Sequence, residues 1–399
     1  MKTADAPGRT NSSHPLRARA IAWSLMICAL ATGLAFTVPG VAATAAVTRP
    51  ASRSANTTFP GRLYSVAAIS ANDAWAAGLG ADSSLIVHWN GSAWSQSLAG
   101  PGYFIGMAAS SARDVWAVGG TNWGSPTQPL AEHWNGKAWA RVPTPSPAGG
   151  GLLNGVAATS PQNAWAVGDV GPGPGIPSAT KPLIEHWNGK TWTIQGDQAP
   201  AGGGHFAAVA ATSAGNAWAV GSTGLNSEGS GQQTLIERWN GKAWTRVPSP
   251  NLPGSTASNL DAVTAVSADN AWAVGYASVG GRYNALTMHW NGQHWTLVAG
   301  NTPGGDASLL NVTSSWTNNI WAVGITNPTR CGNVGPQCQT LIEHWNGVRW
   351  KVIPSPNPPS AYLNVLWGIS AVSRTDIWAV GTTDYGSTLI VHWNGTSWS

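Results

Sequence analysis

The pattern H/R-W-N-G-x-x-W occurs seven times along the chain and constrains its fold more than any other feature. The copies end at Trp94, Trp139, Trp192, Trp244, Trp295, Trp350 and Trp398. A second motif, W-A-V/A-G, precedes each copy, with its tryptophan at Trp75, Trp116, Trp165, Trp218, Trp272, Trp321 and Trp378. Successive copies of this second motif lie 41 to 57 residues apart, a period typical of propellers and other repeat arrays.

One repeat contains the signals for four short strands. Residues 152–160, 164–168 and 183–187 are apolar runs separated by turn-forming residues. Asn188-Gly189 then predicts a type I′ hairpin turn, with positive φ at both central residues, leading into a fourth strand at 191–192. Four antiparallel strands make one blade, so the predicted fold class is all-β, a seven-bladed β-propeller of four-stranded antiparallel blades.

The expected domain order is a signal peptide or N-terminal anchor over 1–45, a linker over 46–60 and the propeller over 61–399. A polar and basic stretch, the apolar run 20–38 and a small-residue stretch follow one another as in secretory signals. The apolar run approaches the length of a membrane span, so a retained anchor is the alternative. Either way we expect a secreted or cell-surface protein. The predicted repeats span about 61–98, 99–144, 145–197, 198–248, 249–299, 300–354 and 355–399.

Charge and cysteine content exclude several function classes. The formal net charge of +4 depends on residues 1–45; without them 16 basic and 15 acidic residues remain. This lacks the cationic footprint of nucleic-acid binding. Cys331 and Cys338 are the cysteines outside the signal, and in an exported chain they predict one local disulfide. Two thiols with no nearby His or acid do not complete a zinc site, so no metal and no cofactor are expected.

Several polar positions repeat with the blades and predict structural roles. An Asn or Asp precedes each W-A-V-G strand, in six repeats within a Ser-x-x-Asn/Asp pattern, and we expect this side chain to hold the turn. The histidine of H-W-N-G occurs in six copies, with Arg238 in the fourth, whereas catalysis needs one asymmetric constellation. The residue before it is Glu in four copies, which suggests a partly exposed position. The repeated tryptophans are expected to fill the layers between blades, with sugar stacking as the alternative.

Loop lengths predict which face binds a ligand. The loops after the second and fourth strands open on one face and are long and variable, as at 120–129, 169–182 and 325–340. Variable loops on a rigid scaffold are where binding usually occurs, although loops without a ligand are the alternative. Exposed aromatic and polar groups there would suit sugar rings or a protein partner. The candidate ligand-binding residues are Tyr103, Trp123, Asp169, His205, Tyr276, Arg282, Tyr283, Asp306, Arg330, Asp384 and Tyr385.

The repeats resemble those of secreted bacterial β-propeller proteins of tectonin, kelch and Asp-box type. The tectonin resemblance rests on VWAVG at 115–119 followed by HWNGKAW at 133–139, and it implies lectin-like recognition. The chain departs from the kelch pattern, since only Gly119-Gly120 matches its double glycine. It also departs from the Asp-box pattern in the spacing between the turn and the tryptophan.

The resulting hypothesis is a monomeric, non-catalytic extracellular binding propeller with a carbohydrate or protein ligand on the long-loop face. The first alternative is a glycoside hydrolase or sialidase-like enzyme, which needs two positioned carboxylates. Asp169, Asp261, Asp306 and Asp384 are available for that role. The second alternative is a purely structural surface protein. The chain ends soon after Trp398, so the last outer strand is expected to be short or completed by residues near 55–60.

Overall fold

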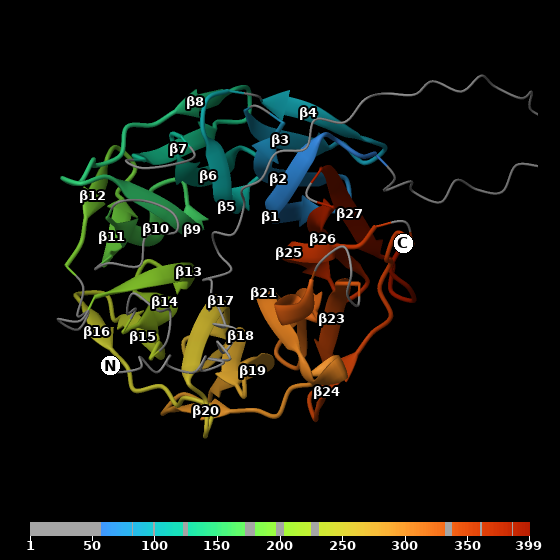
Figure 1. Ribbon diagram of the computed structural model, residues 1–399. Helices are drawn as coiled ribbons and strands as arrows, with labels where there is room; N and C mark the ends of the chain where they lie inside the picture. The colour runs from blue at the N-terminus through green and yellow to red at the C-terminus, as the bar shows by residue number, and fades with distance from the viewer. Residues whose placement is uncertain are drawn as a thin grey trace, which may run out of the picture.

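The computed structural model describes residues 57–399 except 82, 99, 123–126, 172–179, 197–202, 225–230, 332–336, 360 and 385. These residues form seven antiparallel sheets arranged in a ring, six with four strands and one with three (Figure 1). The predicted seven-bladed all-β propeller is confirmed. No helix of the described residues is long and apolar enough to cross a membrane. The expected signal or anchor over 1–45 lies outside them.

Each blade runs outward from the ring centre in chain order. The innermost strands are β1 (Gly61–Ser70), β5 (Tyr103–Ser111), β9 (Gly151–Ser160), β13 (Gly204–Ser213), β17 (Ala257–Ser267), β21 (Ala307–Trp316) and β25 (Asn364–Ser373). The second strands are β2 (Asp73–Gly80), β6 (Asp114–Gly120), β10 (Asn163–Val170), β14 (Asn216–Thr223), β18 (Asn270–Val279), β22 (Asn319–Thr326) and β26 (Asp376–Thr383). The second strand of each blade carries the W-A-V-G motif, and the innermost strand pairs with it.

The outer half of each blade carries the H-W-N-G motif. The third strands are β3 (Ser84–Trp89), β7 (Pro129–Trp134), β11 (Lys181–Trp187), β15 (Gln233–Trp239), β19 (Arg282–Trp290), β23 (Gln339–Trp345) and β27 (Ser387–Trp393). The outer strands are β4 (Trp94–Leu98), β8 (Trp139–Arg141), β12 (Trp192–Ile194), β16 (Trp244–Arg246), β20 (Trp295–Leu297) and β24 (Trp350–Val352). Two 3₁₀ turns, η2 (Pro303–Gly305) and η3 (Pro328–Arg330), lie in the loops of blade 6.

The repeated tryptophans form the layers between blades, as predicted. Trp165 of blade 3 has its ring centroid 4.9 Å from Trp239 and 5.0 Å from Trp244, both of blade 4. The contact recurs around the ring, and Trp378 of blade 7 lies 5.1 Å from Trp89 of blade 1. Because each layer packs three indoles from two blades together, no blade completes its own core.

The ring closes between blades 7 and 1, where β1 contacts β25, β26 and β27. The outer position of blade 7 is filled from both ends of the propeller. Pro60 pairs with Ser387 at one end of β27, while Ser399 exchanges two backbone hydrogen bonds with His392 at the other. The last outer strand was expected to be short or completed by residues near 55–60; blade 7 has three strands, and isolated bridges from Pro60 and Trp398 occupy its outer position.

The repeated Asn or Asp bonds the repeated His of the same blade. In blade 3, His186 Nε2 lies 2.9 Å from Asn163 Oδ1, and its ring lies 4.3 Å from the ring of Trp165. In blade 4, Arg238 takes the histidine position and donates from Nε to Asn216 Oδ1 at 3.1 Å. Its guanidinium lies over the tryptophan of that blade, so the polar pair and the ring contact both survive the substitution.

The predicted role of the Asn or Asp in holding the turn is therefore wrong. In six blades the serine of the pattern does this, as where Ser160 Oγ accepts the backbone N–H of Gln162 at 3.3 Å. Such a short-range bond suits a serine at the start of a turn. The Asn or Asp points instead toward the third strand, because the histidine there supplies its partner.

The predicted type I′ turn is also wrong. Asn188 is not among the described non-glycine residues with positive φ, and only Gly189 of this turn has it, at 89°. Trp187 pairs with Trp192 across the strand ends, which leaves four residues in the connection. Asn188 Oδ1 accepts the N–H groups of the residues two and three positions later, and the same two bonds occur in all seven blades. The asparagine side chain therefore replaces the left-handed backbone that a two-residue turn would need.

The glutamate before the histidine is buried in three of its four copies, whereas Glu132 is partly exposed as predicted. Glu185, Glu237 and Glu343 have 0% exposure, because this position faces the core that Val and Met fill in other blades. Burial raises the pKa of Glu185 to about 8 and that of Glu343 to about 7. Glu343 accepts two hydrogen bonds from Asn301 of the preceding loop, so it joins blade 6 to blade 5.

Candidate binding site in the central channel

Every innermost strand contains a bulge opposite the glycine of W-A-V-G. In blade 3, Leu153 pairs with Gly168 and Gly155 pairs with Val167, so Asn154 has no partner across the strand. The bulge presses the backbone of the innermost strand against the glycine. In the seven blades a Cβ on this glycine would lie 1.9 to 2.1 Å from a backbone carbonyl oxygen. The glycine of the motif is therefore required by the bulge.

The bulge residues form a ring around the channel, at the same position in each blade but with different side chains. They line a cavity of about 240 Å³ between the innermost strands. The bulge lies two to four residues after the start of its strand, hence roughly 10 Å from the face with the long loops. The ring consists of Tyr64, Ile105, Asn154, Ala207, Asp261, Leu310 and Trp367.

The residue after each bulge is small and sets the width of the channel. A Cβ on Gly106 would lie 2.9 Å from Gly155 Cα in the next blade, and one on Gly368 would lie 2.9 Å from Ser65 Cα. The exception is Asn311, which donates from Nδ2 to the backbone oxygen of the neighbouring bulge residue at 3.2 Å. Close approach of the innermost strands leaves the bulge side chains as the groups that reach the channel.

Asp261 is the carboxylate of this ring. Its Oδ1 accepts a hydrogen bond from Asn259 Nδ2 at 2.7 Å, and its Oδ2 is buried with no hydrogen-bond partner among the described residues. Burial raises the pKa of its carboxyl to about 8, because the charged form loses solvation. The charge of Asp261 in turn adds to burial in raising the pKa of Tyr276 and Tyr283.

Aromatic and amide groups complete the ring. Tyr64 of blade 1 and Trp367 of blade 7 meet edge to face, with ring centroids 5.9 Å apart. Blade 1 is three blades from blade 5 in a ring of seven, so Tyr64 stands across the channel from Asp261. Asn154 donates from Nδ2 to Asp169 Oδ1 and to the backbone oxygen of the next blade, both at 2.9 Å.

The cavity lining combines one carboxylate, two amides and an aromatic pair with aliphatic side chains. Among the described lining residues there is no Lys, Arg or His and no second carboxylate. Such a lining can stack against the apolar face of a ring and accept hydrogen bonds from its hydroxyls. A glycosidase pair needs two carboxylates, and the described lining offers only Asp261.

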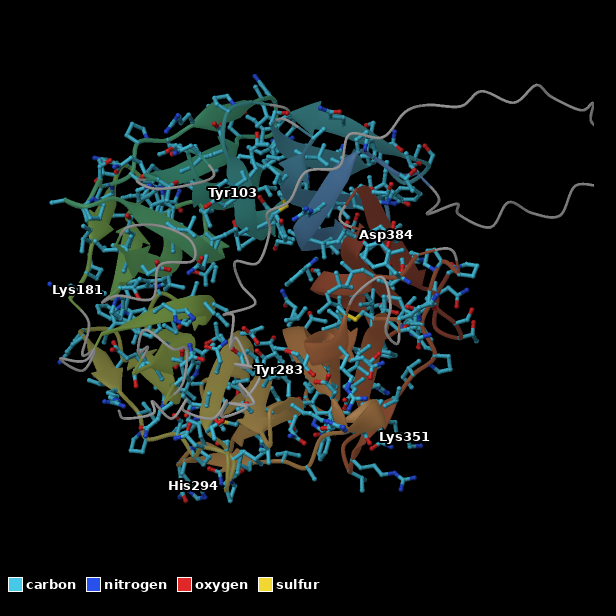
Figure 2. All side chains as sticks on the ribbon, viewed as in Figure 1. Tyr103, Lys181, Tyr283, His294, Lys351 and Asp384 are labelled. Carbon is cyan, nitrogen blue, oxygen red and sulfur yellow. A yellow bond between two sulfur atoms is a disulfide. The ribbon has the colours of Figure 1, made fainter. Side chains whose placement is uncertain are left out.

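Three of the four tyrosines predicted as exposed ligand contacts are buried. Tyr103, Tyr276 and Tyr283 are 0%, 5% and 7% exposed. The rings of Tyr276 and Tyr283 pack at a centroid distance of 4.4 Å. Figure 2 shows Tyr103 and Tyr283 nearer the centre of the ring than Lys181 at its rim. The expectation of exposed aromatics at these positions is wrong, since each ring fills the space where innermost strands begin.

The predicted acids hold loops or neighbouring side chains. Asp306 Oδ1 accepts the N–H of Tyr283 at 3.2 Å, and its Oδ2 accepts the N–H of Thr329 at 3.1 Å. Asp384 Oδ1 accepts the N–H groups that begin blade 7. Asp169 bonds Asn154, and burial raises the pKa of its carboxyl to about 6. Of the four acids considered for catalysis, only Asp261 lines the cavity.

The remaining predicted residues are scattered. Burial lowers the pKa of His205 to about 4, and its Nδ1 lies 3.4 Å from the hydroxyl of Ser222. Arg282 and Arg330 are exposed. Trp123 and Tyr385 lie outside the described residues. The role of these residues as ligand contacts stays a prediction.

Cys331 and Cys338 form the predicted disulfide, with 5.5 Å between their Cα atoms. Backbone bonds tie Cys338 to the start of blade 7, since its N–H donates to Tyr362 O and its O accepts from Asn364 N. Cys338 therefore links the second-to-third connection of blade 6 to the innermost part of blade 7.

The sequence carried a signal for the bulge ring that the loop analysis missed. Each bulge residue lies fourteen positions before the glycine of its W-A-V-G motif, in all seven repeats. This is a fixed position with seven different residues, among them Tyr64, Asn154 and Trp367. A fixed position whose side chain differs in every repeat indicates that packing between the blades does not determine the residue there.

No protein-family model matches the chain, and no curated protein sequence does. Solved structures do match. YCF48 from Cyanidioschyzon merolae is 15% identical over 85% of this chain and 99% of its own, with a TM-score of 0.51. An ulvan lyase, a polysaccharide lyase bound to a saccharide of GlcA and Rha3S units, is 9% identical over 84% and 95%, with a TM-score of 0.56.

A fucose-specific lectin from Aleuria aurantia is 13% identical over 85% of this chain and 96% of its own, with a TM-score of 0.46. At these identities the comparisons support a β-propeller repeat fold and nothing narrower. The tectonin, kelch and Asp-box resemblances and a bacterial origin are not confirmed by them.

Proposed function

We propose that the protein is a non-catalytic, extracellular glycan-binding propeller that takes one sugar ring into its central channel. The observation that carries this proposal is the ring of bulge residues. The seven blades are nearly equivalent in their tryptophan layers and polar pairs, but they differ at the position that lines the channel. A ligand that meets this ring meets a unique arrangement of groups.

The chemistry of the ring suits a sugar. Trp367 and Tyr64 supply aromatic surface against which the C–H face of a pyranose can stack. Asp261 Oδ2 is buried and has no described protein partner, so a hydrogen bond with a sugar hydroxyl there satisfies a buried polar atom. The cavity of about 240 Å³ is below the range of roughly 300–1,000 Å³ typical of drug-sized ligand sites, which favours a single terminal residue over a longer chain.

The direct test is a panel of glycans and cell-wall polysaccharides applied to the full chain, with Asp261→Asn and Trp367→Ala beside it. The control is Asp269→Asn, which removes an exposed carboxylate in a turn on the opposite face. We expect saturable binding whose affinity falls at least tenfold in both channel variants and is unchanged in the control. Binding that all three variants retain would refute the channel as the site.

The same wells distinguish the alternatives. If the protein released reducing ends from a polysaccharide, and Asp261→Asn abolished this release, the glycoside hydrolase hypothesis would replace the binding hypothesis. No binding to any glycan would overturn glycan recognition and leave a protein ligand or a structural role.

Secretion or surface location and a monomeric state belong to the same proposal. The apolar run before the linker and the disulfide support export, since such bonds persist in oxidising compartments. Mass spectrometry of the protein from a secreting host gives the mature N-terminus. A mass that begins near residue 46 is expected, and an intact membrane-bound chain would show a retained anchor instead. Sedimentation of the same sample tests the monomer.

A further inference from the structure

Blade 6 departs from the repeat at an exposed turn on the face opposite the long loops. Six blades have a serine at the end of the innermost strand, and its hydroxyl accepts the backbone N–H two residues later. In blade 6 this position is Trp316, which cannot make that bond. Trp316 is 62% exposed, while the repeat tryptophans pack into the layers between blades. The substitution gives up a turn hydrogen bond and places a large apolar side chain in solvent.

A second exposed apolar residue lies at the same end of blade 6. Val348 is 80% exposed in the W-N-G turn, where the other six blades have a polar residue. The first and third turns of a blade lie on one face because successive strands are antiparallel. The two turns of blade 6 touch, since a Cβ on Gly347 would lie 3.2 Å from Asn318 Cβ. The polar residues at the Val348 position are Ser92, Lys137, Lys190, Lys242, Gln293 and Thr396.

Basic side chains surround these two residues. The guanidinium carbon of Arg374, from the corresponding turn of blade 7, lies 5.4 Å from the Trp316 ring centroid. Arg349 follows Val348 in the chain and is exposed. Lys351 is exposed too; burial lowers the pKa of His344 at this end of the blade, and the charge of Lys351 adds to that effect. Figure 2 shows Lys351 at the rim of the ring.

Acidic side chains are few at this end of the molecule. In blade 6 the described acids, Asp306 and Glu343, are buried. The neighbouring turn of blade 5 carries one exposed acid, Asp269, and Asp376 of blade 7 is bonded to its histidine. Three exposed basic groups therefore flank the apolar pair against one exposed acid, so the local charge is positive.

We propose that the blade 6 turn surface, formed by Trp316, Val348, Arg349, Lys351 and Arg374, docks an acidic segment of a partner protein. The segment places an apolar side chain against Trp316 and its carboxylates against the basic rim. Exposed tryptophan beside arginine is the combination enriched at the energetic centres of protein interfaces. The surface lies on the opposite face from the long loops, so it does not depend on ligand binding in the channel.

The test is a selection of random twelve-residue peptides displayed on phage against the full chain, with counter-selection on Trp316→Ser. This variant restores the residue that six blades carry, so its fold and melting temperature should be unchanged. Val348→Lys, the residue of three other blades, is the second variant. Ile194→Thr, which removes an exposed apolar side chain from blade 3, is the control.

Recovered peptides are expected to contain acidic residues around an apolar residue. They should bind Trp316→Ser and Val348→Lys at least tenfold more weakly than they bind the unsubstituted protein and the control variant. Their affinity should fall with added salt, because the rim contributes by charge. Recovery of peptides without acidic residues would overturn the proposal. So would peptides that bind Trp316→Ser as tightly as the full chain, or no discriminating peptide at all.

Discussion

The tryptophan layers between blades and the bulge ring around the channel follow opposite rules. In the layers the same residues recur in every blade, as in the packing of Trp165 against Trp239. In the ring the backbone geometry recurs while the side chains change from Asp261 to Leu310 to Trp367. A repeat must keep the residues that join neighbours, because each blade depends on the next for its core. It is free to vary a side chain that points to the channel. Recognition in this molecule is therefore expected in the ring.

The largest expected effect comes from Gly168→Ala, which breaks the backbone that creates the ring. Its Cβ would lie 1.9 Å from Leu152 O, so the innermost strand of blade 3 must move. We expect a loss of about 4 kcal/mol or failure to fold, at the exceptional end of single substitutions. Denaturant unfolding measures it. Gly196→Ala is the control, because a Cβ there has open space. Equal stability of the two variants would show that the bulge does not require the glycine.

Trp378→Ala tests the layers at the point where the ring closes. Trp378 is fully buried and packs against Trp89 and Trp94 of blade 1. Loss of a buried indole costs about 3–5 kcal/mol. Trp316→Ala, at an exposed site, is expected to stay within about 0.5 kcal/mol of the parent. Thermal unfolding of the two variants gives the comparison, and a similar loss in both would contradict the assignment of the layers as the core.

The pH dependence of the stability of Asp261→Asn tests whether the carboxyl of the bulge ring is desolvated. Burial raises the pKa of Asp261 from the ordinary value of 3.8 to about 8. The unfolded chain therefore loses this proton first as the pH rises, and the carboxylate lowers stability progressively between about pH 4 and pH 8. Below that window the group is protonated in both states and costs nothing. Asparagine has no such proton, so the stability of the variant relative to the parent should rise with pH across the window.

The comparison isolates Asp261 because the other buried acids are present in both proteins. The groups facing it, Asn259, Tyr276 and Tyr283, stay neutral throughout this range. Denaturant titrations at four pH values measure the difference. Parallel stability curves for parent and variant would show that the carboxyl is not desolvated in the channel.

The smallest expected effect is that of Arg238→His, which restores the repeat residue in blade 4. Histidine can keep the bond to Asn216 and the contact with Trp218, as in the other six blades. It loses the hydrogen bond from Arg238 Nη2 to Ala268 O in the next blade. We expect a cost of about 0.5–1 kcal/mol. A loss as large as that of a buried tryptophan would show that arginine has a role of its own there.

The fold was predictable because the repeat residues act locally and identically in every blade. The period and the four strand signals were enough to predict seven blades, and the short end at Trp398 indicated that the last outer strand would be short or completed by residues near 55–60. Local details were less accessible. Asn188 can hold a turn by its backbone or by its side chain, and the sequence does not distinguish the two. Glu185 looked variable enough to be exposed, yet a buried carboxyl can replace Val when burial keeps it protonated.

The candidate site was the harder prediction. Tyr103 and Tyr283 belong to variable loops by their position in the sequence, but their rings turn inward and pack. The bulge is a property of strand pairing, and the sequence LLNGV at 152–156 does not indicate that Asn154 lacks a pairing residue on the neighbouring strand. Only the superposition of all seven repeats on the motif glycine would have exposed the ring.

The most direct test of the account is a crystal structure of the full chain with a glycan that binds in the panel. We expect one sugar ring between Asp261 and the Trp367–Tyr64 pair, with a hydroxyl on Asp261 Oδ2. A sugar bound only on the long loops, with the bulge ring untouched, would contradict it.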